Sequence, residues 1–551
     1  MSAGVLTRRP ARGATALRGG RLWRPTPYQV FGFLFWLVMS LAYWRIPLCC
    51  DAGQHAAVVE RLRADLLRPR HPMADLPGAG SPYFSPYAVA QGVSARLTGL
   101  SGWETVRLAG PLNLLVLLTG IGRFVRMLTP RPWAPVLALA ASTLLWGTER
   151  AWWSGSLGLM PLAGTLGDPP VFAVGLALWA WALTGRLARD TAGVRFVGPR
   201  GLPSLTGYAG LGLLYGLVLL VDPVTAAAAL AGGAATAAGR QRGWGAAVAG
   251  RWALTAAAAL ATAACWPYFD AFTAMLHGGG APRERPHEDL PGLFWLALPA
   301  GLPALWLRGR RAAREGGGPR AAWRDPLVLM FASACLVAAY GWCVGRPFCG
   351  GLLGLAPLPL QCALAVELAA PRPWPVRRRL LGAVAAATAC TGFLAVQAGA
   401  VVPRSLDPVG FGQPPRWPSY AWAAPYIRPG EVVIADGRHA VRSITGHGPY
   451  LAAPPWPDPA LDERERLRGL ADVRAYLDDG STRAGRAAVV RRHRVRWLLL
   501  TRRRRVPEEA VVVAWSERTG EVLARVGVPA ATRTDAASRS PVVPRSPAAT
   551  R

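Results

Sequence analysis

Long apolar segments alternate with short arginine-containing segments through roughly the first 400 residues of the chain. About eleven of these segments approach the roughly 20 residues that a helix needs to cross a bilayer. They lie near residues 28–48, 108–126, 133–147, 170–185, 204–221, 224–239, 252–267, 291–307, 326–344, 350–369 and 380–401. The pattern predicts a polytopic α-helical membrane protein whose transmembrane domain covers residues 28–402.

The arginines indicate how these spans are oriented. If the basic tail of residues 1–27 is cytoplasmic, alternation brings the arginine-rich loops near 123–131, 186–200, 240–251, 308–324 and 371–379 to the same side. Every loop on that side is then basic, as the positive-inside rule requires. We therefore expect a plasma-membrane protein with its N-terminus inside and, after an odd number of spans, its C-terminal part outside.

The pattern changes after about Pro403. The segments "EVVIAD" (431–436), "VRWLLL" (495–500) and "AVVVAW" (510–515) are typical of strands, and residues 462–479 are typical of an amphipathic helix. Residues 403–529 are expected to form a small extracytoplasmic α/β domain, followed by a disordered Pro/Ser/Arg tail at 530–551. Within this domain, the loop "SITGHGPYLAAPPWPDP" (443–459) either faces a sugar or lipid headgroup or packs on the domain.

Composition narrows the class further. A net charge of +31 would indicate nucleic acid in a soluble protein, but orientation in the membrane explains much of the arginine, so no nucleic-acid partner is expected. The eight cysteines have no spacing typical of a metal site or a disulfide framework.

The external loop 49–107 carries the strongest candidate for chemistry. Asp51 directly follows the first span, where an acid is costly unless it is used. Asp51 and Gln54 fit a capping box at the start of an amphipathic helix that runs to about Leu67. His55 lies one turn later on the same helix face. A carboxylate and an imidazole so placed could deprotonate an acceptor hydroxyl or bind a divalent metal, although two ligands do not define a metal site.

Other polar and aromatic residues lie in the predicted external segments and are candidates for substrate binding. Each also has a structural interpretation, such as a solvated helix face, an aromatic belt or a helix cap. Arg346 lies between the outer ends of two predicted spans, where its guanidinium could bind a lipid phosphate. The candidates are Arg61, Tyr83, Tyr87, Glu149, Arg150, Asp168, His277 and Arg346.

The motif "DAGQH" (51–55), the loop "SPYFSPY" (81–87), the eleven spans and the terminal external domain together resemble the GT-C superfamily. These integral-membrane glycosyltransferases use polyprenyl-phosphate sugars, and an acid in their first external loop acts as catalytic base or helps to hold a metal. Asp51 occupies that place, but Ala52 replaces the second acid of the commoner Asp-Glu form. The resemblance implies a polyprenyl-phosphate sugar donor, Asp51 as base, and an envelope glycan, lipid or protein acceptor at the outer face.

Two other classes stay open. A transporter or flippase of lipid-linked or envelope substrates typically shows internal repeats or charges in mid-span, and neither is evident here. A non-catalytic envelope assembly protein would use the C-terminal domain for binding.

Overall fold

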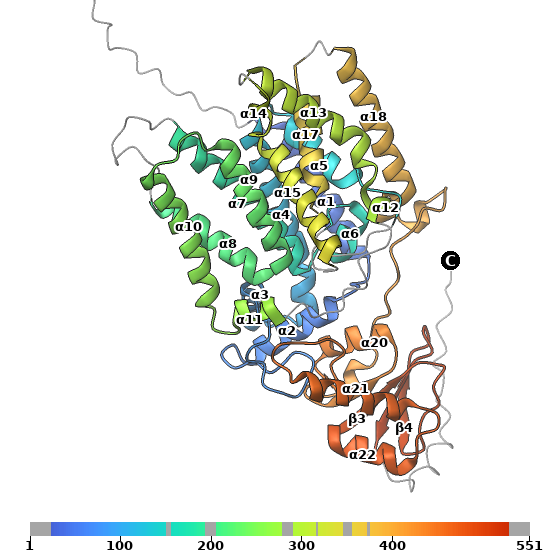
Figure 1. The fold of residues 1–551 in the computed structure, drawn as a ribbon. Helices are drawn as coiled ribbons and strands as arrows, with labels where there is room; N and C mark the ends of the chain where they lie inside the picture. Colours follow the sequence, from blue (N-terminus) through green and yellow to red (C-terminus); the bar gives the residue numbers. More distant parts are fainter. Residues whose placement is uncertain are drawn as a thin grey trace, which may run out of the picture.

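The computed structural model describes residues 24–149, 156–192, 205–277, 290–315, 318–344, 355–371 and 375–527. A helical bundle forms most of the molecule, and a sheet domain lies at one end of it (Figure 1). The helices before the sheet domain are α1 Pro27–Arg45, α2 Ala52–Ala64, α3 Pro86–Thr98, α4 Gly102–Leu128, α5 Ala134–Leu144, α6 Leu159–Thr165, α7 Pro169–Ala192, α8 Leu205–Val221, α9 Pro223–Arg240, α10 Ala246–Ala264, α11 Ala271–His277, α12 Leu290–Phe294, α13 Ala297–Glu315, α14 Pro319–Ala322, α15 Pro326–Val344, α17 Pro357–Leu368, α18 Val376–Gly392 and α19 Ala398–Val401.

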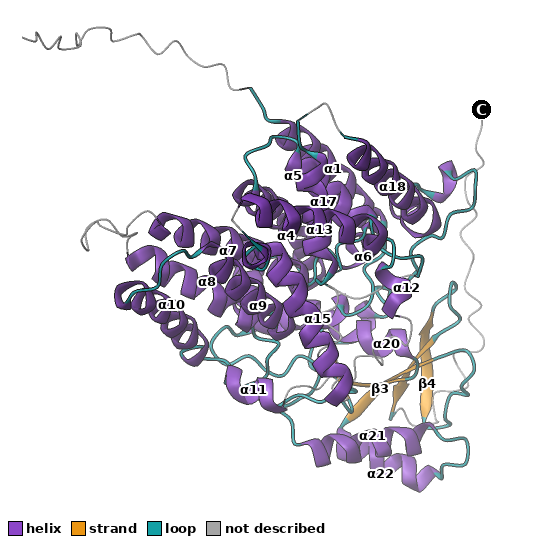
Figure 2. Cartoon of the chain, turned by 45° about the horizontal axis from the view of Figure 1, so that its top comes forward, coloured by secondary structure: helices purple, strands orange, loops and turns teal. Residues whose placement is uncertain are grey.

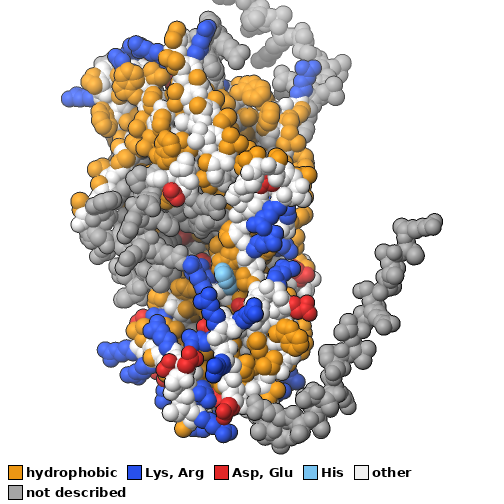
Figure 3. Space-filling model, turned by 90° about the vertical axis from the view of Figure 1, so that its right-hand side faces the viewer, with side chains coloured by type: hydrophobic (Ala, Val, Ile, Leu, Met, Phe, Trp, Pro, Cys, Tyr) orange, Lys and Arg blue, Asp and Glu red, His pale blue; other side chains and the backbone are white. Residues whose placement is uncertain are grey.

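The bundle has the character of a membrane protein. Within the described residues, four helical segments are long and apolar enough to cross a bilayer, and they are Gly102–Leu128, Pro169–Arg189, Ala246–Ala264 and Val376–Val401. Hydrophobic side chains dominate the bundle surface in Figure 3, whereas charged side chains gather on the sheet domain. Each predicted span overlaps at least one helix, but eleven crossing helices remain a prediction because several of the helices are short.

Local sequence signals define where several of these helices begin. Thr26 and Gln29 form a capping box at the start of α1, and Ser101 and Glu104 form another at the start of α4. The amphipathic helix expected from Asp51 to about Leu67 is present as α2, and a second helix, α3, follows it in the loop 49–107. They lie at the end of the bundle that faces the sheet domain (Figure 1).

The C-terminal domain is a five-stranded mixed sheet covered on both faces. Its strands are β1 Val432–Ala435, β2 Tyr450–Leu451, β3 Val495–Leu500, β4 Ala510–Trp515 and β5 Val522–Val526, in the order β2-β1-β3-β5-β4. β2, β1 and β3 are parallel, whereas β5 runs antiparallel to β3 and β4. α20 (Arg438–Ser443) lies on the face toward the bundle, and α21 (Glu463–Leu477) and α22 (Arg483–His493) lie on the other (Figure 2).

Alternating side chains explain the two covered faces. Val433 and Leu499 pack with Ile444 on the α20 side, whereas Ile434 and Leu498 pack with Tyr476 of α21 and its neighbours. The predicted strands at 431–436, 495–500 and 510–515 and the predicted helix at 462–479 are therefore confirmed as β1, β3, β4 and α21.

The loop 49–107 is joined to the C-terminal domain by buried polar contacts. The Asp458 carboxylate accepts from Ser81 Oγ at 2.7 Å and lies 3.3 Å from His71 Nε2, with both residues buried. His71 Nδ1 accepts from the backbone N–H groups of Met73 and Ala74, so Nε2 carries the proton and donates to Asp458. Buried groups paired in this way fix the position of the loop relative to the sheet domain.

Candidate functional site

Asp51 lies between the end of α1 and the start of α2. The backbone of Asp51 is at φ −100° and ψ 6°, and its carboxylate makes no capping hydrogen bond. The predicted capping box is therefore wrong, because a capping side chain requires an extended backbone at this position. The Oδ1 atom instead accepts from Gln54 Nε2 at 3.3 Å and from Arg442 Nη1 at 3.2 Å.

Arg442 reaches Asp51 from α20 of the C-terminal domain. Its side chain is only 17% exposed, and its guanidinium carbon lies 5.3 Å from the centre of the Trp456 ring. Arg442 Nε is buried without a hydrogen-bond partner among the described residues. The Asp51 side chain is 46% exposed, and its Oδ2 atom accepts no hydrogen bond within the described part of the chain. One carboxylate oxygen is thus fixed while the other is free to accept a proton.

Tyr83 supports this arrangement from the loop between α2 and α3. Its hydroxyl donates to Gln54 Oε1 at 3.2 Å, which orients the Gln54 amide so that its nitrogen points toward Asp51. Burial, and to a lesser extent the Asp51 charge, raises the pKa of Tyr83 well above its usual value. Tyr83 therefore remains a neutral hydrogen-bond donor at physiological pH.

His55 follows Asp51 by one turn of α2. Burial lowers the pKa of His55, and the nearby Asp51 carboxylate opposes that effect. The imidazole is then neutral at pH 7 and able to accept a proton. Among the residues that the structure describes, no group of three His, Cys, Asp or Glu side chains could hold a metal ion. Asp51 and His55 alone do not fit a divalent metal site, and we derive no step through a metal.

Arg61 anchors α2 to the C-terminal domain. Its Nη2 atom donates to the carbonyl oxygens of Gly448 at 2.9 Å and Pro449 at 3.2 Å, and its guanidinium carbon lies 3.9 Å from the centre of the Tyr450 ring. Burial lowers the pKa of Arg61. The loop 443–459 therefore contacts α2, an arrangement that neither of the two expectations from the sequence included.

Tyr87 and Asp168 lie on the bundle side of the same region. The Tyr87 hydroxyl donates to the Gly167 carbonyl at 3.0 Å and accepts from Asn113 Nδ2 at 2.8 Å, so its polar atom is used in packing. Asp168 is buried just before α7. The hydrogen bond with Cys50, burial and then the charges of Asp168 and Asp51 raise the pKa of Cys49, so both acids act on the segment that precedes α2.

Of the remaining predicted site residues, only Glu149 has a described side chain, and it makes no contact with Asp51. Glu149 is exposed, and its backbone N–H donates to the Gly292 carbonyl at 3.2 Å. His277 is the last residue of α11. Arg150 and Arg346 lie outside the described residues.

Sequence reasoning missed Arg442. It is one of many arginines in an arginine-rich domain, and its distance from Asp51 in the chain hides the contact. A signal was nevertheless available, since Arg442 directly precedes the turn-rich loop 443–459 that stood out in the sequence.

Similar folds occur in solved membrane enzymes. The apo ArnT from Cupriavidus metallidurans matches 90% of this chain and 97% of its own at 15% identity, with a TM-score of 0.51. ArnT bound to undecaprenyl phosphate matches with the same coverage at 14% identity and a TM-score of 0.50. A mutant of the mycobacterial arabinofuranosyltransferase AftD matches 91% of this chain at 16% identity, with a TM-score of 0.52.

The chain spans only about 41% of AftD, whereas it spans nearly all of ArnT. No protein-family model and no curated protein sequence matches it. At these identities the similarity concerns the fold, and it agrees with the resemblance found in the sequence. The chain has the fold of the GT-C superfamily of membrane glycosyltransferases.

Proposed function

We propose that the protein is a glycosyltransferase that moves a sugar from a polyprenyl-phosphate donor to a cell-envelope acceptor at the outer face of the membrane. The fold it shares with ArnT, which was solved with undecaprenyl phosphate bound, supports a lipid-linked donor. The observation that carries the proposal is the state of Asp51, a carboxylate with one oxygen held by Gln54 and Arg442 and the other open.

Asp51 acts as the general base in this proposal. The free Oδ2 atom of Asp51 takes the proton of the acceptor hydroxyl. At the same time the hydroxyl oxygen of the acceptor bonds to the anomeric carbon of the sugar. The bond from that carbon to the phosphate oxygen breaks, and polyprenyl monophosphate leaves with the bonding electrons. A positioned base of this kind contributes roughly 10²–10⁴-fold to the rate.

Arg442 and Tyr83 have supporting roles. Arg442 holds Oδ1 directly, and Tyr83 orients the Gln54 amide that holds the same oxygen. A carboxylate fixed in this way keeps its open oxygen in one direction, which favours a near-attack arrangement with the acceptor. His55 is a second neutral acceptor one turn away. Arg150, His277 and Arg346 stay predicted substrate contacts, with Arg346 suited to the lipid phosphate.

The other residues predicted to bind substrate are assigned different roles. Asp168 stays a predicted substrate contact; it is buried, and its charge helps to raise the pKa of Cys49 in the segment before α2. Arg61 and Tyr87 already donate hydrogen bonds to backbone carbonyl groups, so we propose that they hold the surrounding structure in place rather than bind the substrate. Glu149 stays a prediction without a contact to Asp51.

The topology is part of the proposal. Because Arg442 contacts Asp51, the loop 49–107 and the C-terminal domain occupy the same side of the membrane. An even number of crossings must then separate them, which agrees with ten spans after the first and with eleven in total. With the basic tail 1–27 inside, both segments are outside.

The test of the function is transfer from defined donors. Membranes that contain the full-length protein are incubated with a panel of radiolabelled polyprenyl-phosphate sugars, and membranes without it serve as the control. The proposal expects one donor to label an envelope acceptor only in the first set. Protein-dependent movement of an intact donor across the bilayer, with no sugar transferred from any donor, would replace it with the flippase alternative.

A further inference from the structure

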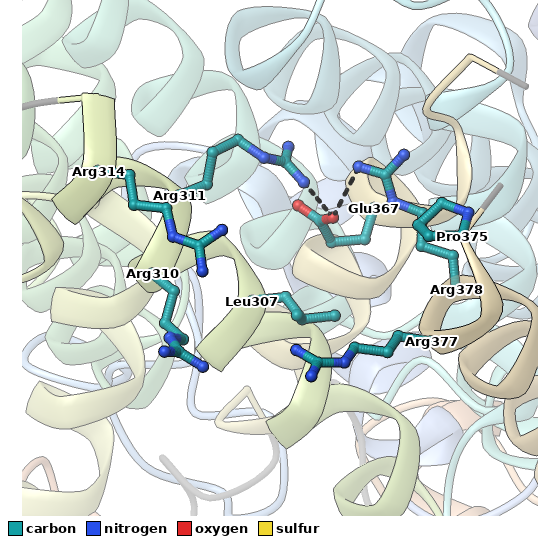
Figure 4. Close-up of a pocket in the computed structure, with 8 residues that line it drawn as sticks. All are labelled: Leu307, Arg310, Arg311, Arg314, Glu367, Pro375, Arg377 and Arg378. Carbon is teal, nitrogen blue, oxygen red and sulfur yellow. Dashed lines mark hydrogen bonds and ion pairs between the residues drawn. The ribbon is translucent and has the colours of Figure 1, made fainter. Parts of the chain in front are cut away.

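Several arginines line a basic pocket (Figure 4) between helices that lie at the end of the bundle opposite the C-terminal domain (Figure 1). It lies between α13, α17 and α18 and has a volume of about 280 Å³. Five arginines and one glutamate are among its lining residues, which are Leu307, Arg310, Arg311, Arg314, Glu367, Pro375, Arg377 and Arg378. In the proposed topology this end is the cytoplasmic surface.

The charges in this pocket do not balance. The fully buried Glu367 carboxylate lies 2.6 Å from Arg311 Nη2 and 3.7 Å from Arg378 Nη2. Arg310, Arg314 and Arg377 have no carboxylate partner within the described part of the chain, and the guanidinium of Arg310 lies 4.5 Å from the centre of the Trp306 ring. Several guanidinium groups are therefore left for an anion, and their planar donors match the oxygens of a phosphate.

An apolar groove lies beside the pocket and shares α17 and α18 with it. It has a volume of about 490 Å³ and lies between α5, α17 and α18. Leucine and alanine dominate its lining, and Arg379 is the only charged residue in it. Arg378 of the pocket lies one helical turn before Gly382 of the groove, so the two run into each other along α18.

We propose that an anionic phospholipid of the cytoplasmic leaflet binds here, with its phosphate among the pocket arginines and one acyl chain along the groove. The occupant must join a phosphate to a hydrocarbon chain, because a cationic pocket and an apolar groove share two helices. Only 28% of the most apolar 18-residue stretch within Val376–Val401 is buried in the protein, which leaves most of that stretch open to lipid. Basic pockets between transmembrane helices on this side are suited to anionic headgroups.

This lipid is not the sugar donor of the proposed reaction. Asp51 directly precedes α2 and Arg442 belongs to α20, and both of these helices lie at the opposite end of the molecule (Figure 1). The bound lipid instead joins α18 to α13 through its headgroup and to α5 and α17 through its chain. Its binding does not depend on the glycosyltransferase activity and can be tested without it.

The test is lipid retention by the full-length protein in detergent, measured by native mass spectrometry. Equal amounts of phosphatidylglycerol, phosphatidylcholine and undecaprenyl phosphate are added, with inorganic phosphate in a separate titration. We expect the wild type to retain phosphatidylglycerol in preference to the other lipids. The double variant R310Q/R377Q should bind it on the order of tenfold more weakly, because two guanidinium groups that face the phosphate are lost.

Two controls separate this site from general surface charge and from misfolding. R320Q/R324Q removes two exposed arginines near α14 that do not line the pocket, and it should retain the lipid as the wild type does. Ala386→Trp should fill the groove and reduce lipid retention without a change in charge. Ala387 is exposed and does not line the groove, so Ala387→Trp should retain the lipid as the wild type does. Equal retention by all these variants, preference for undecaprenyl phosphate, or binding of inorganic phosphate alone would overturn the proposal.

Discussion

The guanidinium of Arg442 lies 3.2 Å from the carboxylate of Asp51, although 391 positions of the chain separate the two residues. Asp51 belongs to the segment directly after the first helix, whereas Arg442 belongs to the terminal sheet domain. The candidate base therefore has its full set of partners only when that domain is docked on α2. This contact gives the C-terminal domain a direct part in the proposed site.

Arg442→Gln should lower the transfer rate by about tenfold, because the carboxylate loses one of the two donors that fix its Oδ1 atom. The expected loss is in kcat rather than in KM for the donor, since Arg442 acts through Asp51. Stability should change little, because an ion pair with a half-exposed partner contributes only a small free energy. Transfer kinetics and thermal unfolding of the purified protein measure the two effects.

Arg468→Gln provides the matched control for Arg442. Arg468 is an exposed residue of α21 that makes no contact with Asp51. The Arg468→Gln variant should therefore transfer sugar at the wild-type rate. A normal kcat in Arg442→Gln, or an equal loss in both variants, would contradict the positioning role.

Gly53→Ala should loosen the docking of the C-terminal domain. A Cβ added at Gly53 would lie 2.5 Å from Ser443 Cα and closer still to the Arg442 carbonyl oxygen, so the backbones must separate. Overpacking of this kind costs about 1–3 kcal/mol. Limited proteolysis between the bundle and the sheet domain should become faster in this variant.

Gly210→Ala is the comparison for that change. Gly210 also lies inside a helix, but a Cβ there meets nothing within 4 Å. Helix propensity alone would favour alanine at both positions. If the two variants were cleaved at the same rate, the tight contact at Gly53 would not hold the domain in place.

His447 should make the stability of the site region fall in acid. Burial lowers the pKa of His447 to about 4 in the folded protein, below its ordinary value of 6.5. Between these values the unfolded chain binds more protons than the folded chain, so stability is complete above about pH 6.5 and decreases as the pH falls toward 4. The decrease from this group is as much as about 3 kcal/mol. His55, whose pKa is also lowered by burial, contributes with the same sign.

Thermal unfolding in detergent from pH 7.5 to 4.5 measures this effect. His447→Gln should flatten the curve, whereas His439→Gln, at an exposed position of α20, should leave it unchanged. A wild-type curve that did not fall in this range, or one that His447→Gln did not flatten, would exclude the predicted titration.

Local pattern was enough to predict the long apolar helices, α2, α21 and three of the five strands. Apolar runs of helical length predicted the bundle helices, and β3 was found at its predicted bounds because its residues are buried and bounded by turns. β2 was missed because it contains only two residues, and its pairing to β1 depends on contacts distant in sequence. The number of crossings needs the membrane itself, since length and apolarity single out only four helical segments in the part of the chain that the structure describes.

The candidate site was predictable only in its local part. Asp51 and His55 lie one helical turn apart, so their proximity follows from the helix period, whereas the hydrogen bond from Tyr83 to Gln54 depends on the fold of the long connection between α2 and α3. The capping box was a reasonable local expectation, but Arg442 and Gln54 now bind the Asp51 carboxylate instead. Arg61 lies on the same helix, yet its partners belong to the sheet domain, so sequence spacing could not distinguish an anchor from a substrate ligand.

The most direct test of the account compares wild type with Asp51→Asn and Asp75→Asn, each expressed at the same level in membranes. Asparagine keeps the shape of the side chain but cannot act as a base, and Asp75 is a second acid of the same loop that pairs with Arg70. With the donor that the wild type uses, the account predicts at least about a hundredfold slower transfer for Asp51→Asn, unchanged donor binding and a normal rate for Asp75→Asn. Transfer by Asp51→Asn at the wild-type rate would contradict the assignment of Asp51 as the base.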